Sequence, residues 1–204
     1  MKGKNIMKKF AAYLFKCIIA GAISLVLLSL FSLVYYNPPI ATEQPDSVTN
    51  YRFVPNKNWS FMLEGVGFGK TDNLGYNNAY YNECLGPDIV FIGSSHLEAL
   101  QVPQDANCVY ILNKMFDEDK EEDNNFKCIN LGVSGHSFEV LASNFKYVAD
   151  KFSDAKYILI ETSNVEFSPE ILDDVIAGKF HTPIEKKSFI AESAQKIPFI
   201  RLMY

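Results

Sequence analysis

The sequence lacks the groups that metal sites and nucleic-acid-binding surfaces require. Its four cysteines and three histidines show no Cys-x-x-Cys or His-x-x-x-His spacing, and structural zinc sites need such pairs. The first 36 residues hold five of the 19 basic residues and no acidic residue, which leaves 14 basic and 24 acidic side chains, a net charge of −10, in the rest of the chain. Nucleic-acid-binding proteins present a basic face to the phosphates. We therefore expect no metal, no cofactor and no nucleic acid.

One long uncharged run is present near the N-terminus. The twenty residues from Cys17 to Tyr36 carry no charge, and at about 1.5 Å rise per residue a helix of this length spans the ~30 Å hydrocarbon core of a bilayer. The run exceeds the roughly 7–15 residues of a signal-peptide core, and no Ala-x-Ala cleavage site follows it. We therefore expect residues 10–36 to be an uncleaved transmembrane anchor in contact with the lipid bilayer.

The distribution of charge and composition predicts how the chain is arranged around this anchor. Lysines precede the apolar run, so the positive-inside rule makes residues 1–9 a cytoplasmic basic tail in a single-pass protein of the cytoplasmic or inner membrane. Residues 37–56, rich in proline, asparagine and threonine, indicate a stalk. Residues 57–204 then form an extracytoplasmic domain, periplasmic or extracellular. An oxidising compartment permits one disulfide there, although isolated cysteines more often fill buried apolar positions; the cysteines concerned are Cys84, Cys108 and Cys128.

The outer domain shows an alternation of strands and helices. Residues 57–87 indicate turns and short strands, and the pattern becomes regular after them. Short apolar runs predict strands, and 3.6-residue periodicity predicts helices. The expected order is strand 88–93, helix 102–116, strand 126–132, helix 136–152, strand 155–161 and helix 168–178. Such alternation is typical of a parallel sheet with helices on both faces, an α/β fold.

Unusual polar residues follow each of the three predicted strands. The first strand ends in "GSSH" (93–96), the second in "NLGVSG" (130–135) and the third in "ETSN" (161–164). Each has an ordinary explanation, because glycine permits tight turns and serine caps helices. Parallel strands bring their carboxyl ends together, however, and acyl transfer needs an exposed hydroxyl near convergent amide donors. The pattern therefore also indicates a serine nucleophile with Gly135 and Asn164 as oxyanion donors.

These three blocks resemble the SGNH (GDSL-like) hydrolases and their extracytoplasmic O-acyltransferase relatives. "VFIGSSH" is similar to the family's Gly-Asp-Ser block, "NLGVSG" to its Asn-x-x-x-x-Gly block and "ETSN" to its third block, and "TDNLGYNN" resembles a lead-in of membrane-anchored members. The resemblance covers residues 71–167. It implies a three-layer α/β/α flavodoxin-like fold with Ser95 as nucleophile and Gly135 and Asn164 as oxyanion donors. It also implies a serine esterase or O-acyltransferase acting on acylated cell-envelope glycans, with an unidentified membrane protein as acyl donor.

The sequence departs from the family pattern at two positions and at its C-terminal end. Ser94 replaces the family's aspartate, and Val165 stands where many members have another aspartate. The family's general base is a histidine in a C-terminal Asp-x-x-His block, which this sequence lacks, so we expect a C-terminally incomplete domain.

The missing block leaves the general base without a matching residue. His96 adjoins the proposed nucleophile and His136 begins a predicted helix, so His181 is the remaining candidate. Because a serine without a base is a weak nucleophile, enzyme activity of this chain stays open. The alternative is a non-catalytic or truncated SGNH-fold envelope protein that acts as a glycan-binding or assembly module.

Overall fold

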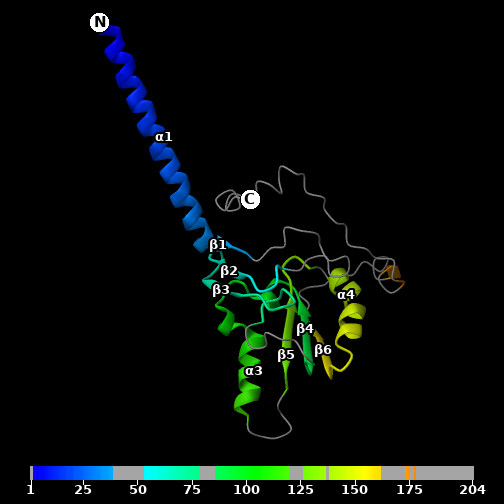
Figure 1. The fold of residues 1–204 in the computed structure, drawn as a ribbon. Coiled ribbons are helices and arrows are strands. Elements are labelled where there is room, and N and C mark those ends of the chain that lie inside the picture. The colour runs from blue at the N-terminus through cyan, green and yellow to red at the C-terminus, as the bar shows by residue number, and fades with distance from the viewer. Residues whose placement is uncertain are drawn as a thin grey trace. The chain divides into compact units, whose positions relative to one another are not determined.

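The structure, a computed structural model, describes the chain in several stretches. They are residues 2–38, 53–78, 86–119, 126–136 and 138–161, with residues 173, 174 and 177. The chain divides into two compact units, one with the N-terminal helix and one with everything described from residue 53 on. We describe each unit by itself (Figure 1).

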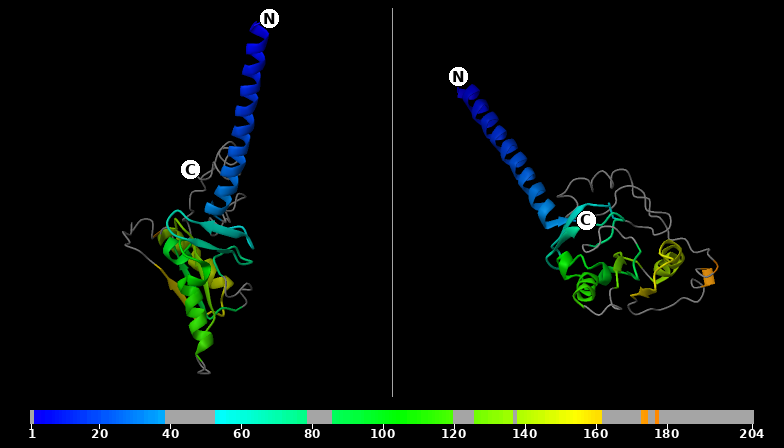
Figure 2. Two further views of the ribbon diagram at one scale, coloured as in Figure 1. Left: turned by 90° about the vertical axis from the view of Figure 1, so that its left-hand side faces the viewer. Right: turned by 60° about the horizontal axis from the view of Figure 1, so that its bottom comes forward.

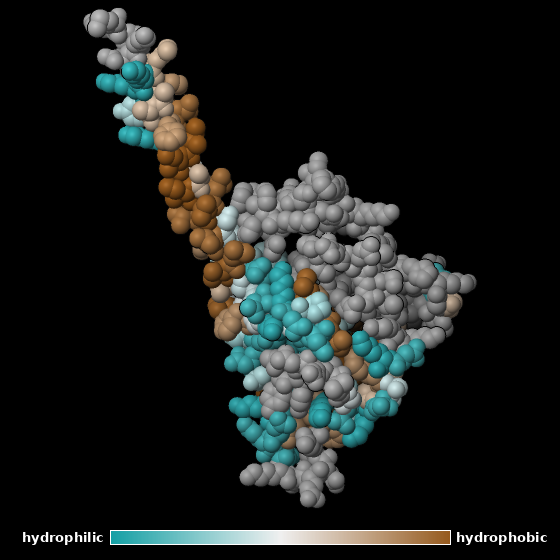
Figure 3. Space-filling view, viewed as in Figure 1, coloured by the Kyte–Doolittle hydropathy of each residue, from teal (hydrophilic) through white to brown (hydrophobic). Residues whose placement is uncertain are grey.

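The first unit is a single long helix. α1 runs over Lys2–Tyr35, and its part Met7–Tyr35 is long and apolar enough to cross a membrane. Figure 3 shows a continuous apolar surface along it, with hydrophilic residues at its N-terminal end. Ser32 donates its hydroxyl hydrogen to the carbonyl oxygen of Leu28 at 2.6 Å, which satisfies a polar group within the apolar stretch. The helix, followed by the two-residue strand β1 (Tyr36–Asn37), is consistent with a single membrane anchor or a signal sequence.

The second unit contains a three-stranded parallel sheet, which confirms the predicted strands. Its strands are β4 (Ile89–Gly93), β5 (Cys128–Gly132) and β6 (Tyr157–Ile160), in the order β5-β4-β6. Gly93 of β4 lies opposite Gly132 of β5, and Ile92 lies opposite Ile160 of β6. The three carboxyl ends therefore lie at one edge of the sheet.

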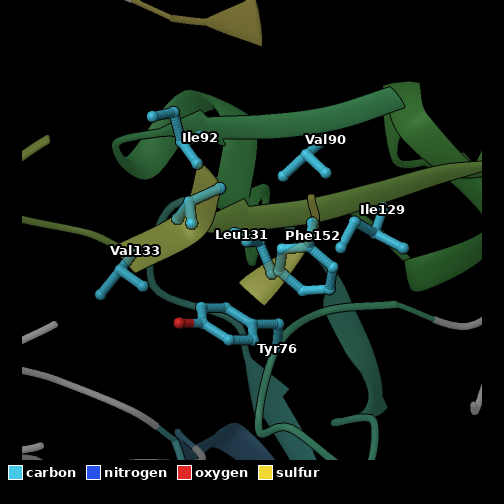
Figure 4. Packing of buried hydrophobic residues seen from close by; sticks show 8 residues of the cluster. Tyr76, Val90, Ile92, Ile129, Leu131, Val133 and Phe152 are labelled. Atoms are coloured by element: carbon cyan, nitrogen blue, oxygen red, sulfur yellow. The ribbon is translucent and has the colours of Figure 1, made fainter. Parts of the chain in front are cut away.

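Helices cover both faces of this sheet, as the sequence pattern predicts. α3 (Cys108–Glu118) and α4 (Phe138–Lys151) lie on opposite sides of the strands in Figure 1 and in the right-hand view of Figure 2. Alternate strand residues point to each side, as they must in a pleated strand. One core consists of Tyr76, Val90, Ile92, Ile129, Leu131, Val133, Val148 and Phe152 (Figure 4). The other consists of Ile89, Leu97, Val109 and Cys128. Each fully buried aliphatic side chain contributes roughly 1.5–3 kcal/mol to stability.

The helices differ from the predicted ones in their bounds. The helix expected over 102–116 is a 3-10 turn at Gln104–Ala106 followed by α3, because the side chain of Asn107 accepts a hydrogen bond from the amide of Val109 at 2.8 Å and starts a new helix there. In α4, Phe145 is exposed although its spacing predicts a buried position. The helix expected over 168–178 lies outside the described residues except for 173, 174 and 177.

The region before β4 contains the short strands that its composition predicts. β2 (Asn58–Phe61) and β3 (Gly67–Lys70) pair antiparallel, and Trp59 of β2 packs in a small core with Phe53 and Leu100. This segment therefore has its own apolar core beside the end of the short helix α2 (Ser95–Glu98).

Two asparagine side chains satisfy the outer edge of β5 in the described sheet. Asn113 of α3 accepts a hydrogen bond from the amide of Cys128 at 2.7 Å and donates one to its carbonyl at 2.8 Å. Asn78 makes the same pair of bonds with Asn130, at 2.7 and 2.9 Å. Each carboxamide makes the two hydrogen bonds that the backbone of a neighbouring strand would make. The buried residues of β5 therefore have their edge amides and carbonyls satisfied without a further strand on that side of the described sheet.

Replacing Asn113 with alanine should lower the stability of the domain markedly. Asn113→Ala leaves a buried amide and a buried carbonyl without partners, and we expect the free energy of unfolding to fall by about 2–4 kcal/mol, since each such group costs about 1–3 kcal/mol. Thermal unfolding followed by circular dichroism measures the change. The matched control is Lys114→Ala on the same helix, whose exposed ion pair with Glu118 at 3.8 Å should matter by less than about 0.5 kcal/mol. Equal effects of the two variants would contradict the role given to Asn113.

Candidate functional site

The turn after β4 holds the two serines that the sequence singles out. Ser94 has extended backbone angles and occupies the N-cap position of α2, but its side chain makes no capping hydrogen bond. Its hydroxyl lies 3.1 Å from Oε2 of Glu161, and its amide donates to the same oxygen at 2.7 Å. The helix-capping explanation is therefore wrong for Ser94, whose hydroxyl is held by a carboxylate at the end of β6.

Ser95, the predicted nucleophile, is the first residue of α2 and is partly buried. Its backbone carbonyl accepts the amide of Ala99, while its hydroxyl has no hydrogen-bond partner among the described residues. The hydroxyl of the neighbouring Ser94, by contrast, is hydrogen-bonded to Glu161. Of the two hydroxyls, that of Ser95 is the one available to a bound molecule.

The turn after β5 presents the predicted oxyanion glycine. The amide of His136 donates to the carbonyl of Val133 at 3.3 Å, and Gly135 between them has φ +82°, the left-handed value that the third residue of a type II turn requires. Gly135 is exposed, and a Cβ added to it would meet no atom within 4 Å. Its amide has no partner among the residues described, so this N–H can donate to a ligand.

The turns after β4 and β5 are joined directly. The amide of Val133 donates to the carbonyl of Gly93 at 3.0 Å, which extends the pairing of the two strands by one residue. α2 also rests on the backbone of β5, because a Cβ on Gly132 would lie 2.5 Å from the amide nitrogen of Glu98. Only glycine permits this approach. The helix that begins with Ser95 and the turn that carries Gly135 are thus held against each other.

A buried carboxyl lies beneath this junction. Glu98 of α2 is fully buried, Ser134 donates its hydroxyl hydrogen to Oε2, and Oε1 has no partner among the described residues. The backbone carbonyl of Glu98 accepts the side-chain amide of Asn77 at 2.7 Å. Burial raises the pKa of Glu98 to about 7, although the hydrogen bond from Ser134 opposes the rise. The group therefore changes charge near neutral pH.

The histidines near the site do not reach Ser95 in the structure. Nδ1 of His96 lies 3.6 Å from Oε1 of Glu161, so this ring is turned toward the carboxylate. Nε2 of His136 is buried and has no partner among the described residues, and burial lowers the pKa of its ring to about 4. His136 is therefore neutral at physiological pH. The other two predicted site residues, Asn164 and His181, lie outside the described residues.

Sequence reasoning names Ser95 and Gly135 as candidates, which stays a prediction, and it does not name the two carboxylates that contact the neighbouring residues Ser94 and Ser134. Glu161 belongs to the "ETSN" block, yet only the asparagine was singled out, and Glu98 stands three residues after Ser95 within the otherwise apolar "HLEAL". For Glu98 the available signal is an acidic residue inside an apolar segment, whereas Glu161, at the start of the polar "ETSN" block, gives no such signal.

The described cysteines, histidines and acidic residues can be compared with the arrangements that metal sites and disulfides use. In the residues that the structure describes, no three histidine, cysteine or acidic side chains gather as metal ligands would. Cys108 and Cys128 are free thiols, and Cys84 lies outside these residues.

No family model, curated protein or solved structure matches the chain.

The buried carboxyl of Glu98 should make stability fall as the pH rises. Its pKa in the folded protein, about 7, exceeds the value of 4.5 of an unperturbed glutamate, so its contribution is full below pH 4.5 and is lost as the pH rises through 7. Glu98→Gln stays neutral throughout. Between pH 4.5 and 8 the unfolding free energy of the wild type should therefore drop by about 3 kcal/mol relative to this variant. Denaturant titrations of both proteins at several pH values measure the difference, and a constant difference would contradict the burial of an ionisable Glu98.

Proposed function

We propose that the chain is a membrane-anchored extracytoplasmic serine esterase or O-acyltransferase of the SGNH type, acting on acylated cell-envelope glycans. The observation that carries the proposal is the junction of two strand ends. The Ser95 hydroxyl follows β4 and the Gly135 amide follows β5, neither has a hydrogen-bond partner within the described part of the chain, and the hydrogen bond from Val133 to Gly93 joins the two segments. A nucleophile beside a pre-positioned amide donor is the arrangement that acyl transfer uses.

The proposed reaction has two acyl-transfer steps. The Ser95 hydroxyl oxygen attacks the carbonyl carbon of the substrate ester while its proton passes to the general base, for which His181 is the candidate. The carbonyl oxygen becomes an oxyanion that accepts hydrogen bonds from the Gly135 amide and the Asn164 carboxamide. The ester C–O bond then breaks, and the leaving alcohol takes the proton from the base. Water or an acceptor hydroxyl of the glycan next gives its proton to the base and attacks the acyl carbon, the bond from that carbon to Oγ of Ser95 breaks, and Oγ takes the proton back. Attack by water makes the protein an esterase, and attack by the glycan hydroxyl makes it a transferase.

The fold and the membrane segment fit the same proposal. In it, the parallel sheet with its covering helices is the N-terminal part of a three-layer flavodoxin-like domain within residues 57–204. The segment 10–36 is an uncleaved anchor with the basic tail in the cytoplasm, and residues 37–56 are the stalk. A membrane partner that supplies the acyl group belongs to the transferase version.

The second candidate is a non-catalytic envelope module that binds glycan or assists assembly. It is favoured by the state of the histidines among the described residues, because His96 faces Glu161 and His136 is buried and neutral. A serine with no base beside it is a weak nucleophile, so the turns after the strands would serve to bind a ligand without catalysing acyl transfer.

Covalent labelling distinguishes the two candidates. The full chain in detergent should react with a fluorophosphonate probe, and Ser95→Ala should reduce the labelling to background because the probe bonds only to an activated hydroxyl. Ser60→Ala, which removes a partly buried serine from the separate antiparallel pair, is the matched control and should label like the wild type. Peptide mapping of the adduct identifies the serine. Absence of label on Ser95 in the wild type would contradict the catalytic proposal and favour the binding module.

The orientation of the outer domain can be tested with its exposed thiol. Cys108 is exposed and free, whereas the thiol of Cys128 is buried, and burial followed by the charge of Asp88 raises its pKa to about 12. In a Cys84→Ser background, a membrane-impermeant maleimide should label Cys108 in cells with an intact inner membrane. The control is Cys108→Ser in the same background, which should take up no label. Labelling that appears only after the inner membrane is permeabilised would contradict an extracytoplasmic domain.

A further inference from the structure

The hydrogen bond between the buried Glu98 and the exposed Ser134 connects the two halves of the candidate site. Glu98 lies three residues after Ser95 on α2, and Ser134 immediately precedes Gly135 in the turn after β5. The Ser134 hydroxyl donates to Oε2 of Glu98, and this side-chain bond links the helix to the turn. The second link is the backbone bond from Val133 to Gly93. A displacement of Ser134 therefore displaces the amide of its neighbour Gly135.

Packing alone does not explain an acid at this position. Glu98 is completely buried, and its Oε1 has no partner among the described residues. A buried polar group without a partner destabilises a fold, and an apolar side chain of similar volume would fill the same space at lower cost. What an apolar residue cannot do is accept the Ser134 hydrogen bond. The bond to the turn is thus the property that distinguishes glutamate here.

We propose that Glu98 is a positioning residue, which holds the oxyanion turn through Ser134 so that the Gly135 amide faces the acyl group on Ser95. This inference rests on the proposed acyl chemistry and extends it to a residue that touches no substrate. It assigns Ser134 the role of the relay between the two segments. The effect on catalysis is geometric, because an oxyanion donor stabilises the developing charge only at hydrogen-bond distance.

The experiment uses the full chain in detergent and two independent readouts. The first is amide hydrogen exchange at Val133 and His136, whose N–H groups are held by the carbonyls of Gly93 and Val133 and so report on the turn. The second is the rate at which the fluorophosphonate probe labels Ser95. Ser134→Ala and Glu98→Met should each speed the exchange and slow the labelling by about tenfold or more, since both remove the link. Ser134→Thr keeps a hydroxyl and should restore both rates to within about threefold of the wild type.

The control separates positioning from a general loss of stability. Asn113→Ala removes two buried hydrogen bonds at the opposite end of β5, so it lowers stability while the turn stays linked. It should leave exchange at Val133 and His136 close to the wild-type rate under native conditions. Equal acceleration by Asn113→Ala, unchanged exchange in Ser134→Ala, or failure of Ser134→Thr to restore it would each overturn the role of Glu98. A third outcome separates the two proposals. If hydrogen exchange in the variants changes as expected but the wild type takes up no fluorophosphonate label, the link between Glu98 and the turn is supported and the proposed acyl chemistry is overturned.

Discussion

The parallel register of β4 between β5 and β6 is the constraint on which the candidate site depends. It sets Gly93 opposite Gly132, so that the turns after both strands begin at the same level. Asp88 fixes the other end of the strands, since its carboxylate accepts the amide of Lys127 at 2.9 Å and pairs with Lys156 at 2.9 Å. Burial opposes ionisation of this carboxyl, but these partners hold its pKa below the ordinary value. A slip of one residue would turn every buried strand side chain to the other face. The packing of the core therefore fixes the register, and the register fixes the positions of the turns that form the candidate site.

Buried polar groups at the edge of the sheet and in the candidate site differ in how completely they are hydrogen-bonded. At the outer edge of β5, Asn78 and Asn113 pair fully with backbone groups, and such satisfied bonds stabilise the fold. Glu98 is treated differently, because one oxygen is bonded and the other has no partner among the described residues. Burial raises its pKa to about 7, so the ionised carboxylate destabilises the fold near neutral pH. Buried groups of this second kind are typical of sites where chemistry, and not stability, determines the residue.

The sequence predicts the strands well and the site only in part, for reasons that the structure makes plain. Continuous apolar runs predict β4, β5 and β6. In β4 and β5 this pattern reflects burial on both faces, whereas Tyr157, Leu159 and Ile160 of β6 are exposed. Ser95 and Gly135 stand out in the sequence because they lie in the turns that follow such runs, and their roles as nucleophile and oxyanion donor stay predictions. Glu98 and Glu161 were missed because local sequence does not show which segments a charged side chain meets, and their partners Ser134 and Ser94 are 36 and 67 residues away. The start of α3 was missed for a local reason, the cap formed by Asn107.

The parts of the proposed mechanism differ in how strongly the sheet determines them. The positions of the proposed nucleophile Ser95 and the proposed donor Gly135 follow from the strand register and from the contact of α2 with the backbone of Gly132, so they do not depend on where a general base lies. A general base at His181 would come from a segment about twenty residues beyond β6, where the described strands impose no register. Electrostatic stabilisation of an oxyanion retains much of its value when the base is removed, since the donors act on the charge wherever the proton has gone. In the proposed mechanism the described residues therefore supply the oxyanion side of the site, and the general base determines whether the site catalyses acyl transfer or only binds its ligand.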